Sequence, residues 1–276
     1  MHFFLLGVRP KKRILAAVMR VSVITVTYNA ETTLEKTLLS VLGQSCHEYE
    51  LLVVDGASSD GTVALLKQYE ARVAQGEFGI APDRFRWHSE PDGGLYDAMN
   101  KGLEWAQGDF VWFINSGDKI YDDATLQRIV DAMEAAPDAD VVYGQSLIID
   151  PDDRVLGERH RIAPARLTKR SLLDGLVVCH QSILARRTLA PRYDLQYKLT
   201  ADYDWVCRLL DASRRNLYID AYLSRFMSAG LSSQKRKQSL KERFVIMRRQ
   251  FGLLPALWSH LRILLKYPFV TRKHVY

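Results

Sequence analysis

Short apolar runs alternate with segments of helical periodicity along the first half of the chain. The apolar runs are rich in branched and aromatic side chains and predict strands buried on both faces of a sheet, at residues 21–27, 49–55, 84–88 and 109–114. Apolar residues at three- and four-residue spacing predict four helices. One follows a capping-box pattern at Thr32 and Glu35, one follows Asp60, and two lie at 95–106 and 123–135. This alternation predicts an α/β fold with a mostly parallel central sheet.

The second half of the chain is less regular. A strand is expected to begin at Val141, and residues 151–153 have the composition of a hairpin turn. The remaining pattern predicts helices at 167–176 and Ala201–Ala212 and strands at 177–184 and 217–226.

Both ends of the chain differ from this pattern. Residues 2–8 are apolar but too short to span a bilayer, and their basic cluster follows the apolar run, whereas an export signal would place it first. Residues 1–19 are therefore interpreted as an N-terminal extension, either a start-site artefact ahead of Met19 or a weakly membrane-associated tail. Residues 231–276 interleave basic and apolar positions, which predicts amphipathic helices that lie in a membrane interface or pack as a hairpin on the domain.

Composition and charge narrow the class of protein. The 276 residues are 47% hydrophobic and 25% charged, which suits a globular chain with a sizeable core. The net charge of +6 lies largely at the two ends, and no nucleic-acid motif stands between them, so nucleic acid is not an expected partner. Three widely spaced cysteines lack the pattern of a zinc or disulfide framework, which favours a reduced cytoplasmic compartment.

Polar residues follow consecutive predicted strands, where a doubly wound sheet binds its ligands. These positions are Tyr28-Asn29, Asp55, Gly93-Gly94 and the run Asn115-Ser116-Gly117-Asp118. Together they indicate a nucleotide site, in which Asp55 accepts hydrogen bonds from a base, Tyr28 stacks on it, and N–H groups at Leu95 face a diphosphate. Asp118 can hold a hard divalent cation against phosphate oxygens. Taken singly, each also suits an ordinary turn, loop or core residue.

Several longer motifs, in this order, resemble the inverting family 2 glycosyltransferases with a GT-A fold, especially bacterial exopolysaccharide and O-antigen members. The resemblance covers about residues 20–226. It rests on Val-Ile-Thr-Val-Thr-Tyr-Asn-Ala, Val-Val-Asp-Gly-Ala-Ser-Ser-Asp-Gly-Thr, Ser-Glu-Pro-Asp-Gly-Gly-Leu-Tyr-Asp-Ala-Met-Asn-Lys-Gly, Phe-Ile-Asn-Ser-Gly-Asp, Cys-His-Gln-Ser and Ala-Asp-Tyr-Asp-Trp.

The resemblance implies a role for each matching residue. It implies nucleotide contacts at Thr27, Tyr28, Asn29 and Asp55, and contacts with the donor phosphates and sugar at Asp92, Asp97 and Asn100. Asn115, Ser116 and Asp118 match the metal-binding Asp-x-Asp region, and the implied cofactor is Mg²⁺ or Mn²⁺. Asp202 matches the general base, and His180 and Gln181 match the acceptor side. Asp204 is a further acceptor-side candidate and the second candidate for the base. Because Asn115 and Gly117 stand where many relatives have acids, Asp118 is the only carboxylate of that run.

The expected organisation is a GT-A domain at residues 20–230, with a Rossmann-like nucleotide-binding half at about 20–145, an acceptor half at about 146–230, and a C-terminal helical extension at 231–276. The expected activity is inverting transfer from a nucleotide-diphosphate sugar to a glycan or polyprenyl-linked acceptor in bacterial surface polysaccharide synthesis. The protein would work in the cytoplasm, bound peripherally to the inner face of the plasma membrane. Two alternatives stay open: a catalytically silent nucleotide-sugar-binding protein, and a nucleotidyltransferase, which the missing basic Gly-rich loop after the first strand disfavours.

Overall fold

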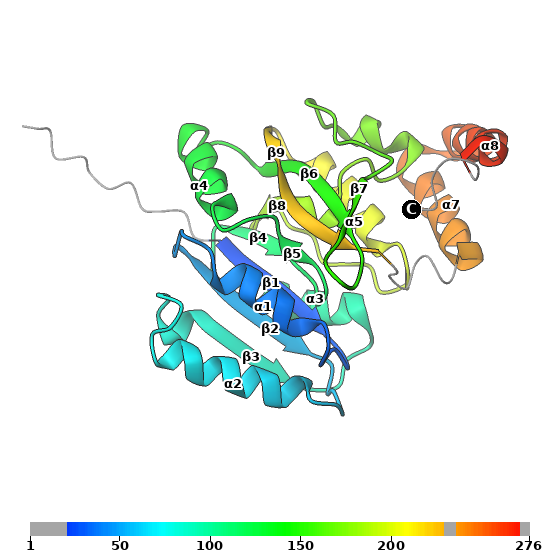
Figure 1. Ribbon diagram of the computed structural model, residues 1–276. Coiled ribbons are helices and arrows are strands. Elements are labelled where there is room, and N and C mark those ends of the chain that lie inside the picture. Colours follow the sequence, from blue (N-terminus) through cyan, green and yellow to red (C-terminus); the bar gives the residue numbers. More distant parts are fainter. Residues whose placement is uncertain (1–20, 229–235, 271–276) are drawn as a thin grey trace, which may run out of the picture.

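The computed structural model describes residues 21–228 and 236–270 (Figure 1). The predicted extension at 1–19 lies outside the described residues. The strands are β1 (Val21–Thr27), β2 (Tyr49–Asp55), β3 (Phe85–Ser89), β4 (Phe110–Phe113), β5 (Lys119–Ile120), β6 (Val141–Ile149), β7 (Val155–Glu158), β8 (Ile183–Arg186) and β9 (Asn216–Met227). The helices are α1 (Leu34–Leu42), α2 (Thr62–Ala74), α3 (Leu95–Trp105), α4 (Thr125–Ala135), α5 (Ala201–Ala212), α7 (Arg236–Phe251) and α8 (Leu253–Val270), with short 3₁₀ helices η1 (Pro82–Arg84), η2 (Lys169–Asp174) and η3 (His180–Ser182).

One mixed sheet joins the two halves of the described chain. Its order is β3-β2-β1-β4-β8-β6-β9-β5, and β7 pairs with β6. The first four strands are mutually parallel, which confirms the predicted parallel arrangement. β8 then runs antiparallel to both β4 and β6, so the sheet changes direction where the two halves meet.

The sheet is buried between two layers of helices. On one face α1, α2 and α4 contribute their apolar stripes to a core with one set of strand side chains. On the other face α3, α5 and α7 cover the alternate side chains. α3 packs so closely on β1 that a Cβ added at Gly102 would overlap Ile24. Every residue of β1 and β2 is buried, as the unbroken apolar runs predict.

Three local predictions were wrong. α1 begins at Leu34 without a side-chain cap, and Glu35 instead accepts a hydrogen bond of 3.0 Å from the Tyr69 hydroxyl. The predicted helix at 167–176 is the shorter η2, and the predicted strand at 177–184 is η3 followed by β8. Since β8 enters the sheet antiparallel to β4, the chain before it must turn across the strand ends. By contrast, the strand predicted at 217–226 and the turn at 151–153 are confirmed as β9 and the β6–β7 hairpin.

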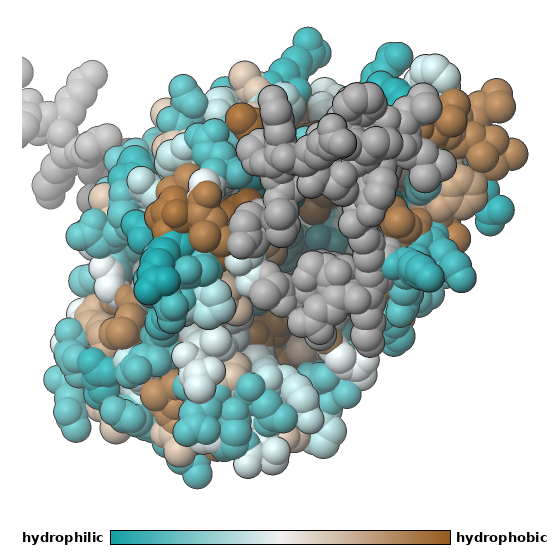
Figure 2. Space-filling view, turned by 45° about the vertical axis from the view of Figure 1, so that its right-hand side comes forward, coloured by the Kyte–Doolittle hydropathy of each residue, from teal (hydrophilic) through white to brown (hydrophobic). Residues whose placement is uncertain are grey.

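The C-terminal segment forms a helical hairpin that turns at Gly252, where φ is 91°. α7 packs on α5 and fully buries Ile246 and Met247, which confirms the packed-hairpin interpretation for this helix. α8 keeps an exposed apolar face, which is visible at the upper right of Figure 2. None of the helices in the two described ranges has the length and apolar character needed to traverse a bilayer.

Candidate active site

Two adjoining cavities lie beyond the carboxyl ends of the parallel strands. A wide cavity of about 710 Å³ is formed by the ends of β1, β2 and β4 and the loop before α3. A deep cavity of about 490 Å³ continues from it toward α5, η3 and the end of β9. Leu95, Asn115 and Ser116 line both. Most of the predicted strand-end residues therefore gather at this edge, namely Tyr28, Asn29, Gly94, Asn115 and Ser116.

The wide cavity has an exposed aromatic ring and a tightly packed glycine at its mouth. Tyr28 is 66% exposed although it directly follows a buried strand. A Cβ added at Gly56 would lie 2.7 Å from Asp92 Oδ2 and 3.3 Å from the Tyr28 ring, so this wall has no room for a side chain. Asp92 accepts a hydrogen bond of 2.8 Å from the Gly94 N–H and so shapes the loop before α3.

Two further predicted residues supply polar groups here. Thr27 lines the wide cavity, and its Oγ1 is buried without a hydrogen-bond partner. Asn29 adopts a positive φ of 46°, and its Oδ1 accepts a hydrogen bond from the Ser59 N–H at 2.9 Å. The loops after β1 and β2 thus hold each other in place around the cavity.

Three predicted donor residues lie elsewhere. Asp55 is fully buried, lines neither cavity, and accepts hydrogen bonds from Ser58 and Ser89, so its carboxylate orders the loop after β2. Asn100 is also buried outside both cavities, because its side-chain amide exchanges hydrogen bonds of 3.0 and 2.7 Å with the Tyr193 backbone. Asp97 accepts a 2.9 Å hydrogen bond from the Gly93 N–H and lines a separate cavity of about 40 Å³ beside α3.

Asp118 lies in the deep cavity at a tightly constrained turn. Its Oδ1 accepts a hydrogen bond of 2.9 Å from the Met227 N–H, and its Oδ2 accepts one of 2.8 Å from Gln181 Nε2. Burial raises the pKa of this carboxyl to about 7, although both hydrogen bonds favour the ionised form. Gly117 before it has a φ of 94°, and a Cβ there would overlap the Met227 side chain. The turn therefore requires glycine.

Asp202 lines the same deep cavity from the first turn of α5. Its Oδ1 accepts a hydrogen bond of 2.9 Å from the Tyr203 N–H and a longer one of 3.4 Å from the Tyr96 hydroxyl. Burial raises the pKa of Asp202, and the charges of Arg159 and Arg243 oppose this effect. A carboxylate whose pKa is raised binds a proton more readily than an exposed one.

Asp204 differs from its prediction as an acceptor-side residue. It is fully buried on another side of α5, where it pairs with Arg208 at 2.6 Å and accepts a 2.8 Å hydrogen bond from Gln250 of α7. Residues two apart on a helix do not share a face, so only one of the two acids reaches the cavity. Asp204 instead ties α5 to the C-terminal hairpin.

His180 and Gln181 line the deep cavity but are largely engaged by neighbouring residues. His180 Nε2 shares a hydrogen bond of 2.6 Å with the Tyr193 hydroxyl, and burial lowers the pKa of the imidazole to about 4. The ring is therefore neutral at pH 7, and it packs against Phe113 and Trp205. The side-chain amide of Gln181 donates its hydrogen bond to Asp118.

Sequence reasoning missed three side chains of the deep cavity. Tyr96 stands inside a recognised motif, but its contact with Asp202 depends on the packing of α3 against α5. Arg159 and Lys198 lie in irregular segments without a motif, and only the fold brings them to the cavity.

Two side chains of the deep cavity, Asn115 and Asp118, carry oxygen atoms of the kind that hard cations bind. Within the two described ranges, no cluster of three or more His, Cys, Asp or Glu side chains is placed to hold a metal. Asp118 nevertheless lies beside Asn115, whose Oδ1 is buried without a hydrogen-bond partner. Mg²⁺ and related ions bind through one or two protein oxygens plus waters and substrate phosphates, so this partial ligand set is chemically suitable.

Comparison with known proteins agrees with this arrangement. The family model described as glycosyl transferase family 2 matches residues 22–191. This chain belongs to glycosyl transferase family 2. It is similar to the PGL/p-HBAD biosynthesis glycosyltransferase Rv2957 of Mycobacterium tuberculosis, with 31% identity over 193 residues, or 68% of each chain.

Solved structures show that the glycosyltransferase has a GT-A fold. Residues 1–349 of Staphylococcus aureus TarS, solved in complex with UDP, match with a TM-score of 0.63 and 18% identity, covering 93% of this chain and 74% of that one. In the longer TarS chain the match spans 39% of its length. The mannosyltransferase PcManGT of Pyrobaculum calidifontis, solved with GDP-Man and Mn²⁺, matches with a TM-score of 0.57 and 16% identity, covering 90% and 75% of the two chains.

Proposed function

We propose that this family 2 glycosyltransferase is an inverting, metal-dependent enzyme that transfers a sugar from a nucleoside-diphosphate donor to a hydroxyl group of a glycan or lipid-linked acceptor. The product would belong to a bacterial surface polysaccharide. The observation that carries the proposal is that Asp118 and Asp202, far apart in the sequence, line one cavity that opens into a second, nucleotide-sized one.

The donor would lie across the two cavities. Its base would stack on the exposed ring of Tyr28, and Thr27 Oγ1 and Asn29 would offer polar contacts. Its diphosphate would lie over the start of α3, where the N–H groups of Gly93 and Gly94 are taken by Asp97 and Asp92 but those of Leu95 and Tyr96 remain available. The N-terminus of a helix favours negative charge, so it would stabilise the diphosphate as it leaves.

Asp118 and Asn115 would hold a Mg²⁺ or Mn²⁺ ion, which when bound offsets negative charge on the departing diphosphate. The solved complex of PcManGT with GDP-Man and Mn²⁺ supports this assignment by analogy. Gln181 and the Met227 N–H would keep the Asp118 carboxylate oriented.

Asp202 would take the proton from the acceptor hydroxyl as that oxygen attacks the anomeric carbon. The bond from the sugar to the diphosphate then breaks on the opposite face, which inverts the anomeric configuration. The raised pKa of Asp202 makes it a better base than an ordinary exposed carboxylate, and Tyr96 holds its Oδ1.

The exposed face of α8 would place the enzyme on the cytoplasmic face of the plasma membrane. Leu254 and Trp258 are 79% and 60% exposed, one helical turn apart, while Ala256 is buried against the domain. Exposed basic residues of α7, including Lys237 and Lys241, would add attraction to anionic lipid.

A donor screen tests the central proposal. The protein would be melted in the presence of UDP-, GDP- and dTDP-sugars with Mn²⁺ or with EDTA, and the donors that raise the melting temperature would then be assayed for release of nucleoside diphosphate. We expect one base to be preferred and release to require the metal. Binding without release under any condition would instead support the nucleotide-sugar-binding alternative, and the absence of both would contradict the proposal.

A further inference from the structure

The deep cavity contains two positive side chains to which the transfer reaction described above assigns no contact with donor or acceptor, although the charge of Arg159 also acts on Asp202. Arg159 follows β7, and Lys198 precedes α5. Among the described residues, neither forms an ion pair with a carboxylate, and the Arg159 guanidinium donates only a long 3.4 Å hydrogen bond to the Leu176 carbonyl. Two unpaired cations in one cavity favour an anionic ligand.

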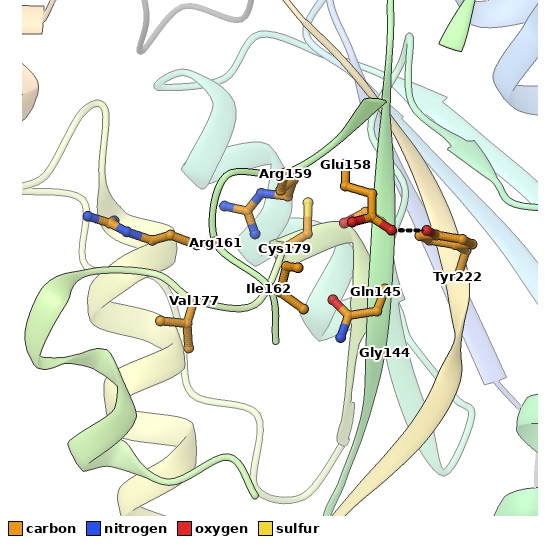
Figure 3. Close-up of a pocket in the computed structure, with 10 residues that line it drawn as sticks. Gly144, Gln145, Glu158, Arg159, Arg161, Ile162, Val177, Cys179 and Tyr222 are labelled. Atoms are coloured by element: carbon orange, nitrogen blue, oxygen red, sulfur yellow. Dashed lines mark hydrogen bonds between the residues drawn. The ribbon is translucent and has the colours of Figure 1, made fainter. Parts of the chain in front are cut away.

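The local packing orients Arg159. Its neighbour Glu158 turns away and accepts a hydrogen bond from the Tyr222 hydroxyl, so it does not neutralise the guanidinium (Figure 3). Arg159 also lines a small cavity of about 20 Å³, in which its Nη1 and Ser146 Oγ are buried without hydrogen-bond partners. A space of this size holds about one water molecule, which can bridge these two groups and fix the guanidinium.

The position of these cations separates them from the cavity assigned to the base of the donor. Neither Arg159 nor Lys198 lines the wide cavity with Tyr28, whereas Asn115 and Leu95 of the diphosphate site line both cavities. Both cations share the deep cavity with the proposed base, Asp202.

We propose that Arg159 and Lys198 form a subsite for an anionic group, a phosphate or carboxylate, that the acceptor carries near its reacting hydroxyl. This inference rests on the proposed function, because it assumes that the deep cavity receives the acceptor. The planar guanidinium can bind two oxygens of such a group at once, while the Lys198 ammonium adds a point charge. An acceptor with this group would be held with its hydroxyl at Asp202.

Binding of simple probes tests the subsite. The wild-type protein is first saturated with Mn²⁺ and whichever of UDP, GDP or dTDP it binds, so that the donor site is filled. Hexyl phosphate, hexanoate, hexanol and inorganic phosphate are then titrated by calorimetry. We expect one of the two hexyl anions to bind at least about tenfold more tightly than hexanol, because a charge-assisted hydrogen bond contributes that much or more.

Three variants locate the effect. Arg159→Gln should weaken binding of the hexyl anion by about ten- to a hundredfold, Lys198→Gln by less because its side chain is exposed, and Arg159→Lys should fall between wild type and Arg159→Gln. Arg154→Gln, in the preceding hairpin turn and paired with the exposed Asp152, is the matched control and should leave binding unchanged. Melting temperatures would show that each variant is folded.

Several results would overturn the inference. Equal binding of the hexyl anion by wild type and the Arg159 variants would remove the subsite. A parallel loss of nucleoside diphosphate binding would assign Arg159 to the donor. Inorganic phosphate bound as tightly as hexyl phosphate would indicate a free-phosphate site. If no nucleotide binds, the proposed function fails, and the same titrations without nucleotide still decide whether Arg159 and Lys198 bind an anion.

Discussion

The buried carboxyl of Asp118 should make the stability of the metal-free protein depend on pH. Its pKa is raised from 3.8 to about 7 by burial, so the folded state binds a proton more tightly than the unfolded state does. The resulting penalty begins as pH rises above the unfolded value and is complete above the folded value. At 1.36 kcal/mol per pKa unit, the whole penalty is about 4 kcal/mol, of which about 3 kcal/mol develops between pH 5 and pH 8.

Asp118→Asn isolates this contribution, because the amide does not titrate and other ionisable groups cancel in the comparison. The Asn Oδ1 can still accept from the Met227 N–H, while the Gln181 amide must turn over to accept from Asn Nδ2. Unfolding by urea in EDTA would give the free energy of unfolding of both proteins at each pH. We expect the difference, variant minus wild type, to increase by up to about 3 kcal/mol from pH 5 to pH 8.

A bound cation should reverse the penalty. Mn²⁺ competes with the proton for Asp118, so it should stabilise the wild type more at pH 8 than at pH 5 and should stabilise the variant much less at both. Parallel pH curves for wild type and variant, differing by less than about 0.5 kcal/mol across the range, would refute the reasoning about burial at this carboxyl.

Three further variants test the base, its neighbour and the membrane face. Asp202→Asn keeps the acceptor of the Tyr203 N–H but cannot take a proton, so transfer should stop while donor binding stays within a few-fold. Asp211→Asn, on the same helix, is the control. Activity retained by Asp202→Asn would exclude Asp202 as the base. Tyr96→Phe removes a donor to the ionised carboxylate, so the acidic limb of the pH profile of kcat should move to higher pH, and an unmoved limb would exclude the contact. The double variant Leu254→Glu with Trp258→Glu should no longer float with vesicles that contain phosphatidylglycerol, whereas the control Val155→Glu should still float. Equal flotation of wild type, double variant and control would contradict the membrane proposal.

The first half of the fold follows from the sequence because its strands are apolar over their whole length and end at glycine or short polar residues. Such runs are typical of parallel strands, and their polar ends meet by geometry alone. Helix periodicity explains why Asp202 reaches the cavity and Asp204 does not, since residues two apart on α5 occupy different faces.

The remaining features depend on contacts between distant segments. The sequence does not show that Ser89 donates a hydrogen bond to the Asp55 carboxylate. Only the pairing of β2 with β3 brings these two residues together. The apolar stretch before β8 has no periodicity that distinguishes a strand from 3₁₀ turns, so a strand was predicted where η3 carries His180. Arg159 lies at the cavity because it directly follows the β6–β7 hairpin, and no sequence motif marks this position.

The contact between Gly102 and Ile24 has a consequence for how such enzymes diversify. Because no side chain fits between α3 and β1, the helix lies close on the strand, and this contact sets the height of α3 above the sheet. With the donor bound as proposed, this wall would act as a fixed reference. New acceptor preferences would then arise by changing the irregular segments around Arg159 and Lys198, with no need to rebuild the part of the molecule that would handle the activated sugar.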